Sequence, residues 1–186
     1  MALVPYLDAE DLDPADRDLL ARPIFLYRAL VNSPAALRAI DMPTKWIRFD
    51  CELAPRLKEL VMLQVGYLMG NAYEFSHHVK LGYDFGVTDD DIRGLVEEAH
   101  GRRSDLGETE RAVLTATRAI VVDGAVGDIA FKALEELLGR ARAVDVVVIA
   151  GFYVGIVRIL DSLQVDVEED YLPYLTTHPL PDTPLA

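Results

Sequence analysis

Apolar residues recur along this chain at the spacing of α-helices, and no stretch shows the alternation typical of a half-buried strand. The clearest example follows Pro55, where Leu57, Leu60, Leu63 and Tyr67 recur three or four residues apart. A helix that carries such an apolar stripe must bury it against other helices. The pattern therefore predicts an all-α fold, a single-domain helical bundle.

Start and stop signals divide the chain into expected elements. Ser33-Pro34 and Asn71 are typical helix starts, Gly70 and Gly86 are typical helix ends, and Pro43 should break or kink a helix. We expect an N-terminal arm over residues 1–20, a helical domain over 20–167 and an extended, proline-containing tail over 168–186. The expected helices lie near residues 24–31, 33–41, 44–52, 55–70, 71–85, 88–100, 108–122, 129–138 and 141–163.

The charge balance excludes several kinds of partner. Asp and Glu number 31 against 18 Lys and Arg, which gives a formal net charge of −13. A field of this sign repels the phosphate backbone of nucleic acids and the surface of anionic membranes. We therefore expect neither partner, and a small molecule is the expected ligand.

Cysteine content and hydropathy indicate a soluble protein. Cys51 is the single cysteine, so neither an intramolecular disulfide nor a Cys-x-x-Cys site can form. The longest apolar stretch, Val146 to Val157, is shorter than the roughly 20 residues that cross a bilayer. The first residues lack the basic start and the apolar run of a signal peptide. We expect a cytoplasmic protein.

Three polar residues, Asn71, Glu74 and His78, fall on one face of an expected helix. Glu59 lies on the preceding helix. With cysteines at positions 71 and 74, the segment would read as a Cys-x-x-Cys-x-x-x-His redox site after a glutamate. Without those thiols, the pattern predicts acid–base chemistry, and His78, Glu74 and Glu59 are the candidate catalytic residues.

Structural interpretations of the same residues remain open. Asn71 and Glu74 fit a capping box at a helix start, and Glu74 with His78 fits a helix-stabilising pair. Glu59 fits an ordinary solvated charge. His77 lies about 100° around the helix from His78, so we expect it to face outward or toward an interface.

The two glutamates and His78 could bind iron, manganese or zinc, but the sequence offers no fourth ligand, so we predict no metal and no cofactor. Tyr67, Tyr73 and Tyr153 could line a pocket, although tyrosines at helical spacing are more often core residues. Asn71, Tyr73 and Tyr67 are the candidate substrate-binding residues.

Several short motifs together resemble the carboxymuconolactone decarboxylase and alkylhydroperoxidase D superfamily. The resemblance covers roughly residues 20–167. The motifs are Asn32-Ser33-Pro34-Ala35-x-Leu37, Pro55-Arg56-Leu57-Lys58-Glu59-Leu60, Tyr73-Glu74-Phe75-x-x-His78, Gly86-Val87-Thr88-Asp89-x-x-Ile92 and Gly151-Phe152-Tyr153.

The resemblance implies an all-α fold of the alkylhydroperoxidase D-like type and self-association, as a homotrimer, homohexamer or dimer. In the peroxidase branch, two cysteines, a Glu and a His reduce peroxides. Asn71 and Glu74 stand at the cysteine positions here, while Glu59 and His78 match the Glu and the His. The decarboxylase branch lacks the cysteine pair, carries a Glu and a His that resemble Glu74 and His78, and releases carbon dioxide from a carboxylated muconolactone.

The leading hypothesis is a cofactor-free decarboxylase or lyase that acts on a small lactone or carbonyl acid in aromatic-compound catabolism. In it, His78 moves the proton with a pKa near neutral, Glu74 orients it or acts as the base, and Glu59 is a second carboxylate. The alternatives are a non-catalytic or small-molecule-binding member of the family and, third, peroxidase-like chemistry at Cys51.

Overall fold

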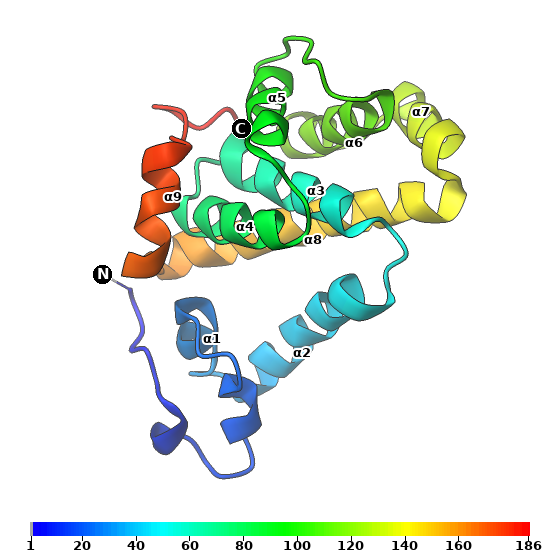
Figure 1. Ribbon diagram of the computed structural model, residues 1–186. Coiled ribbons are helices and arrows are strands. Elements are labelled where there is room, and N and C mark those ends of the chain that lie inside the picture. The colour runs from blue at the N-terminus through cyan, green and yellow to red at the C-terminus, as the bar shows by residue number, and fades with distance from the viewer. Residues whose placement is uncertain (1) are drawn as a thin grey trace.

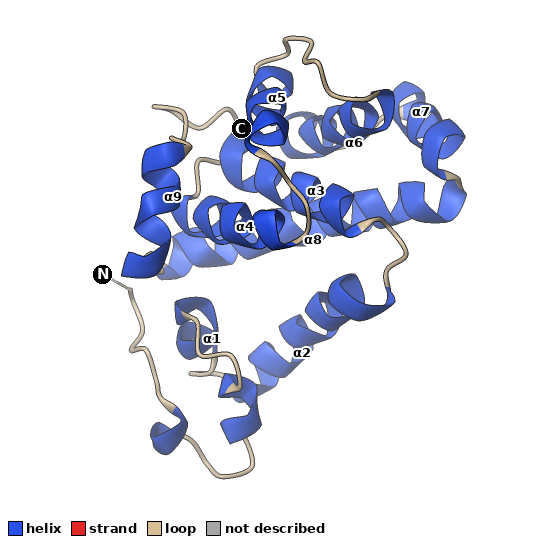
Figure 2. Cartoon of the chain, viewed as in Figure 1, coloured by secondary structure: helices blue, strands red, loops and turns tan. Residues whose placement is uncertain are grey.

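Helices account for all regular secondary structure in residues 2–186, which the computed structural model describes (Figure 2). No strand occurs in this part of the chain, so the predicted all-α fold is confirmed. The α-helices are α1 (Phe25–Leu30), α2 (Pro34–Lys45), α3 (Pro55–Leu68), α4 (Ala72–Asp84), α5 (Asp89–Ala99), α6 (Glu108–Arg118), α7 (Asp128–Leu138), α8 (Arg140–Leu163) and α9 (Leu172–Thr177). Short 3₁₀ segments lie at Ala9–Asp11, Arg17–Leu20 and Glu169–Tyr171, and π-helical segments at Trp46–Asp50 and Ala119–Asp123.

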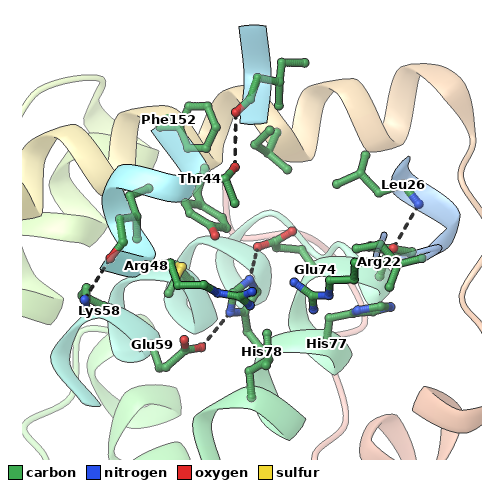
Figure 3. Close-up of a pocket in the computed structure, with 18 of the residues that line it drawn as sticks. Arg22, Leu26, Thr44, Arg48, Lys58, Glu59, Glu74, His77, His78 and Phe152 are labelled. Atoms are coloured by element: carbon green, nitrogen blue, oxygen red, sulfur yellow. Dashed lines mark hydrogen bonds and ion pairs between the residues drawn. The ribbon is translucent and has the colours of Figure 1, made fainter. Parts of the chain in front are cut away.

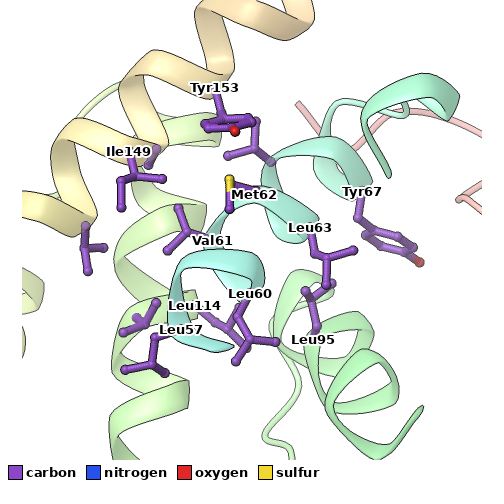
Figure 4. Packing of buried hydrophobic residues seen from close by; sticks show 14 of the residues in the cluster. Leu57, Leu60, Val61, Met62, Leu63, Tyr67, Leu95, Leu114, Ile149 and Tyr153 are labelled. Carbon is purple, nitrogen blue, oxygen red and sulfur yellow. The ribbon is translucent and has the colours of Figure 1, made fainter. Parts of the chain in front are cut away.

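Helix α3 lies at the centre of the fold, between α4, α5, α6 and α8 (Figure 1). Every residue of α3 from Leu57 to Leu68 is buried. Leu95, Leu114 and Ile149 belong to the same hydrophobic cluster and come from three of these neighbouring helices (Figure 4). A polar side chain on such a helix cannot face water, so it must find a partner inside the protein.

Helices α3 and α4 approach each other closely at Gly66. A Cβ atom at this position would lie 2.9 Å from the backbone nitrogen of Phe75, which is shorter than side-chain atoms pack. Gly70 then turns the chain with a φ of +65°, in the left-handed region that glycine tolerates best. Asn71 starts α4 directly afterwards as its N-cap. The short turn and the close crossing bring the side chains of α3 within reach of those on α4.

Helix α2 runs through Pro43, where the sequence predicts a break or a kink. Pro43 lacks the amide that would donate to the carbonyl of Ala39, so one helical hydrogen bond is missing there. Three residues later the backbone becomes π-helical, over Trp46–Asp50, and the amide of Cys51 bonds the carbonyl of Trp46. Residues 34–50 are therefore helical without a break.

The N-terminal segment packs on the bundle through a second hydrophobic cluster. Leu19, Leu26 and Leu37 bury their side chains there together with Ile156 and Leu160 of α8. Figure 1 shows α1 and α2 beside α4 and α8. These N-terminal residues therefore form part of the wall around α4.

The C-terminal segment differs from its prediction. The sequence predicts an extended tail over residues 168–186, whereas Leu172–Thr177 form the helix α9, which packs against α4. Pro173 is compatible with this helix because it sits in the first turn, where a missing amide costs no hydrogen bond. Near the end of the chain, the amide of Leu185 bonds the carbonyl of Leu68 at 2.7 Å.

Helix α8 is long and apolar enough to cross a membrane, judged by length and composition alone. Its Val146, Ile149, Ala150 and Val157 are fully buried in the hydrophobic core of the bundle. The same composition is typical of the core helix of a helical bundle.

Candidate active site

His78 lies between two glutamates in the interior of the protein (Figure 3). Its Nδ1 is 2.7 Å from Oε2 of Glu59 on α3, and its Nε2 is 2.9 Å from Oε1 of Glu74 on α4. The three side chains are at most 7% exposed. The structure therefore brings together the three residues that the sequence predicts to be catalytic.

The two contacts of His78 differ in hydrogen-bond alignment. The contact with Glu59 has the alignment of a hydrogen bond. The contact with Glu74 has the distance of an ion pair, but Glu74 Oε1 receives no aligned hydrogen bond and is buried. A buried carboxylate oxygen without a donor retains an unused capacity to accept a proton or a hydrogen bond.

The surroundings of His78 keep its imidazole charged. Burial by itself lowers the pKa, but the negative charges of Glu74 and Glu59, together with the hydrogen-bonding contacts, outweigh burial and raise the pKa of His78 to about 10. The sequence hypothesis of an imidazole with a pKa near neutral is therefore corrected. His78 is an imidazolium at physiological pH, because it faces two buried carboxylates rather than one.

A cavity of about 120 Å³ opens beside this cluster, large enough for a small organic molecule or several waters. Its wall is formed by α1, α2, α3, α4, α8 and the π-helical segment Trp46–Asp50. The polar and charged lining residues are Arg22, Tyr27, Thr44, Arg48, Lys58, Glu59, Tyr73, Glu74, His77, His78 and Tyr153.

Besides His78, three cationic side chains line the cavity. Lys58 is buried and donates from Nζ to the backbone carbonyls of Ile47, at 2.8 Å, and Cys51, at 3.4 Å. The guanidinium groups of Arg22 and Arg48 form no ion pair within the described part of the chain. Figure 3 shows them reaching toward the histidines from opposite sides. Guanidinium groups without a carboxylate partner are well suited to bind an anionic ligand.

His77 also lines the cavity, although the sequence predicts that it faces outward or toward an interface. It is 3% exposed, and its ring is stacked between Tyr73 and Tyr171, with centroids 4.1 and 3.5 Å away. Its Nε2 contacts Oε2 of Glu168 at 2.8 Å. Burial lowers the pKa of His77 despite this carboxylate, so its ring is neutral at physiological pH. The N- and C-terminal segments cover the side of α4 that would otherwise face solvent.

The predicted substrate-binding residues do not lie together. Tyr73 lines the cavity, and its hydroxyl accepts a hydrogen bond from the amide of Leu26. Tyr67 is buried on another side of α3, where its hydroxyl contacts Nε2 of His100 at 3.3 Å. Asn71 is the N-cap of α4 and donates from its amide to Asp161 at 2.7 Å. Tyr67 and Asn71 are absent from the cavity wall.

Tyr153 belongs to the site as well. Its ring meets the His78 ring edge-on, with the centroids 5.2 Å apart. Burial and the charges of Glu74 and Glu59 raise the pKa of Tyr153 well above its usual value. Its hydroxyl is therefore protonated at physiological pH and can act as a hydrogen-bond donor.

Metal binding and thiol chemistry find little support in the geometry. No group of three or more His, Cys, Asp or Glu side chains arranged for a metal ion occurs within residues 2–186. His78 carries a proton on each ring nitrogen when it is charged, so it has no lone pair for a metal. Burial raises the pKa of the Cys51 thiol, and its sulfur lies 3.6 Å from the Asp145 carboxylate, which disfavours a thiolate.

Comparisons with known proteins are consistent with this architecture. The sequence model of the carboxymuconolactone decarboxylase family matches residues 33–119. One similar solved structure is a protein of unknown function from Agrobacterium tumefaciens, for which an antioxidant defence role as AhpD has been suggested. Its sequence is 23% identical and its TM-score is 0.65. The match covers 75% of this chain and 94% of that chain. The debrominase Bmp8, solved as a cysteine variant with 2,3,4-tribromopyrrole, is 20% identical with a TM-score of 0.76, over 95% and 97% of the two chains.

No curated protein matches the chain significantly. At these identities the two solved structures establish the fold alone. With the single cysteine at position 51, neither residue 71 nor residue 74 can take part in a thiol pair. Residues 33–119 thus match the carboxymuconolactone decarboxylase family, and the chain has the alkylhydroperoxidase D-like fold without a Cys-x-x-Cys pair.

Proposed function

We propose that this protein is an acid–base enzyme of the decarboxylase or lyase type, without a bound cofactor, that acts on a small lactone or carbonyl acid from aromatic-compound breakdown. The observation that carries the proposal is the His78 imidazolium, held between Glu59 and Glu74 beside a cavity. Buried ionisable groups with strongly shifted pKa values are found preferentially at functional sites.

The cavity wall supports an anionic substrate. Arg22 and Arg48 present guanidinium groups that form no ion pair within residues 2–186, and a carboxylate can accept two hydrogen bonds from one such group. Tyr27, Tyr73 and Phe152 add aromatic surface to the same wall. An acid with a flat, unsaturated or lactone ring fits this combination of charge and apolar surface.

His78 is suited to stabilise the charge that develops in such a reaction. In a decarboxylation, the bond between the departing carboxylate and the adjacent carbon breaks, and its electron pair forms an enolate. The Nε2–H group of His78 is not aligned with Glu74, so it can donate a hydrogen bond to the enolate oxygen and stabilise its negative charge. One proton must then reach the carbon, and His78 can deliver it and recover it from water.

Glu74 and His77 can supply the basic groups of this site. Oε1 of Glu74, which receives no aligned hydrogen bond, can accept a proton, and the neutral ring of His77, oriented by Glu168, lies on the same cavity. A charged His78 beside a neutral His77 gives one acid and one base on consecutive residues. We assign His78 as the acid and Glu74 or His77 as the base.

The test is turnover of a panel of small γ-lactone carboxylic acids and β-keto acids, followed by carbon dioxide release and product chromatography. We expect turnover with at least one acid, and His78→Gln should lower it about 10²- to 10⁴-fold. Calorimetric binding of these acids without turnover would instead favour the non-catalytic, ligand-binding alternative. An alkyl peroxide assay tests the third possibility, which requires that Cys51→Ser abolish a measurable activity.

A further inference from the structure

A second hollow, of about 510 Å³, lies on a different side of the bundle from the active-site cavity. It forms where the loop after α5 meets α6 and the π-helical segment Ala119–Asp123. It shares no lining residue with the first cavity. The lining residues are Glu98, Gly101, Arg102, Arg103, Arg111, Ala112, Thr115, Arg118, Ala119 and Asp123.

The charge of this hollow opposes that of the whole protein. The chain has a net charge of −13, yet four arginines line the hollow against two carboxylates, Glu98 and Asp123. One of the two is already engaged, because Oε1 of Glu98 accepts hydrogen bonds from the amide and the hydroxyl of Ser104. A local excess of arginine in an acidic protein concentrates anions at one place on the surface.

The arginines of the hollow are poorly paired. Arg102 forms an ion pair with Glu97, but within the described residues Arg103, Arg111 and Arg118 form no ion pair. Arg118 donates from Nε to the backbone carbonyl of Ala99 at 3.2 Å. The Nε of Arg111 is buried and has no hydrogen-bond partner at all. A buried guanidinium nitrogen without an acceptor is costly, which points to an acceptor that a ligand would supply.

We propose that this hollow binds the phosphate group of a small molecule. A phosphate presents several acceptor oxygens at once, and planar guanidinium groups from different elements can each donate to a different oxygen. Its negative charge offsets the excess of arginines over carboxylates that remains after Arg102 pairs with Glu97. The net charge of the chain disfavours a long polyanion such as nucleic acid, so a small phosphorylated molecule is the better match.

The test uses inorganic phosphate and pyrophosphate as probes, at constant ionic strength maintained with sodium chloride. We expect saturable binding in calorimetry, accompanied by NMR shifts of the arginine Nε–H signals. Arg103→Gln and Arg111→Gln should each weaken binding about tenfold, the loss expected for one charged hydrogen bond. Arg103 is exposed, so its replacement should leave the fold intact. The matched control is Arg158→Gln, because Arg158 is also exposed and lies on α8, outside the hollow.

The proposal would be overturned if sodium chloride at equal ionic strength caused the same calorimetric signal and the same NMR shifts as phosphate. Equal binding by the wild type and the Arg103→Gln and Arg111→Gln proteins would also overturn it. A third result would also overturn it. In that case phosphate does not bind, and sedimentation shows that the wild type is a dimer which Arg103→Gln dissociates. An acidic surface of a second copy, rather than a phosphate, would then occupy the hollow.

Discussion

Asn71 accepts a hydrogen bond from the backbone amide of Glu74 at 2.8 Å, while the carboxylate of Glu74 contacts His78. The sequence leaves two roles open for Glu74, as part of a helix cap or as part of a site. Both occur, because the cap uses the backbone of Glu74 and the site uses its side chain. The reciprocal half of a capping box is missing, since the amide of Asn71 bonds the carbonyl of Gly66 instead.

Matched variants at these two residues should separate stability from activity. Asn71→Ala removes the cap and should lower the free energy of unfolding by about 1 kcal/mol. Glu74→Gln retains the backbone hydrogen bond but removes the charge beside His78, so turnover should fall by about 10²-fold or more. Denaturant unfolding and steady-state kinetics measure the two effects. If Glu74→Gln retained wild-type turnover, Glu74 would not be part of the reaction.

The charge states of the two neighbouring histidines should differ at pH 7. We expect His78 to carry protons on both ring nitrogens and His77 on only one, since the pKa of His78 is raised to about 10 and that of His77 is lowered. Nitrogen NMR of the ring signals reads both states in one spectrum. A midpoint for His78 near 6.5, its ordinary value, would contradict the two-carboxylate environment.

The same pKa shift predicts how stability depends on pH. Because the folded protein binds the His78 proton more tightly than the unfolded chain, the contribution of this group is fully present below pH 6.5. It is then lost as the pH rises toward about 10. Denaturant unfolding at several pH values should show stability falling over this range, and Glu59→Gln should reduce the fall.

The two arginines of the cavity should select ligands by charge. Arg22→Gln and Arg48→Gln should each raise the dissociation constant for a γ-lactone carboxylic acid about tenfold, because each removes a charge-assisted hydrogen bond. Binding of the corresponding methyl ester should change little. Isothermal titration calorimetry with both ligands measures the difference. Equal losses for acid and ester would show that the arginines shape the cavity without recognising charge.

The close crossing of α3 and α4 should tolerate no side chain at position 66. Gly66→Ala places a methyl group 2.9 Å from the backbone of Phe75, and relieving this clash should cost about 1 to 3 kcal/mol of stability. Gly151→Ala is the matched control, because nothing lies within 4 Å of its Cβ position and the site is exposed. It should stabilise the helix by up to about 1 kcal/mol. Thermal unfolding of both variants checks this contrast.

The helices were largely predictable because their start and stop signals are local. Pro55, Asn71 and Gly86 mark boundaries through their own backbone preferences, so neighbouring residues suffice to place them. The proline content of the tail predicts an extended segment, whereas Leu172–Thr177 are helical. The position of Pro173 within the first turn makes it compatible.

From the sequence, only the site residues that meet where α3 crosses α4 could be predicted to lie together. Glu59, Glu74 and His78 are linked by helical spacing and by the short turn at Gly70. Arg22, Glu168 and the orientation of His77 depend on segments distant in sequence that fold back over α4. No local sequence pattern indicates such contacts between distant segments.

Glu59, Glu74 and His78 all lie inside residues 33–119, but part of the cavity wall does not. Arg22 and Leu26 precede the family-matched segment, and Phe152, Tyr153 and Ile156 follow it. The proposed acid–base groups thus come from one stretch of the chain, whereas the cavity wall around the proposed ligand also draws on residues before and after it. Under the proposed function, substitutions in the flanking stretches would change which molecule enters and leave Glu59, Glu74 and His78 in place, so a new substrate could be acquired without a new mechanism.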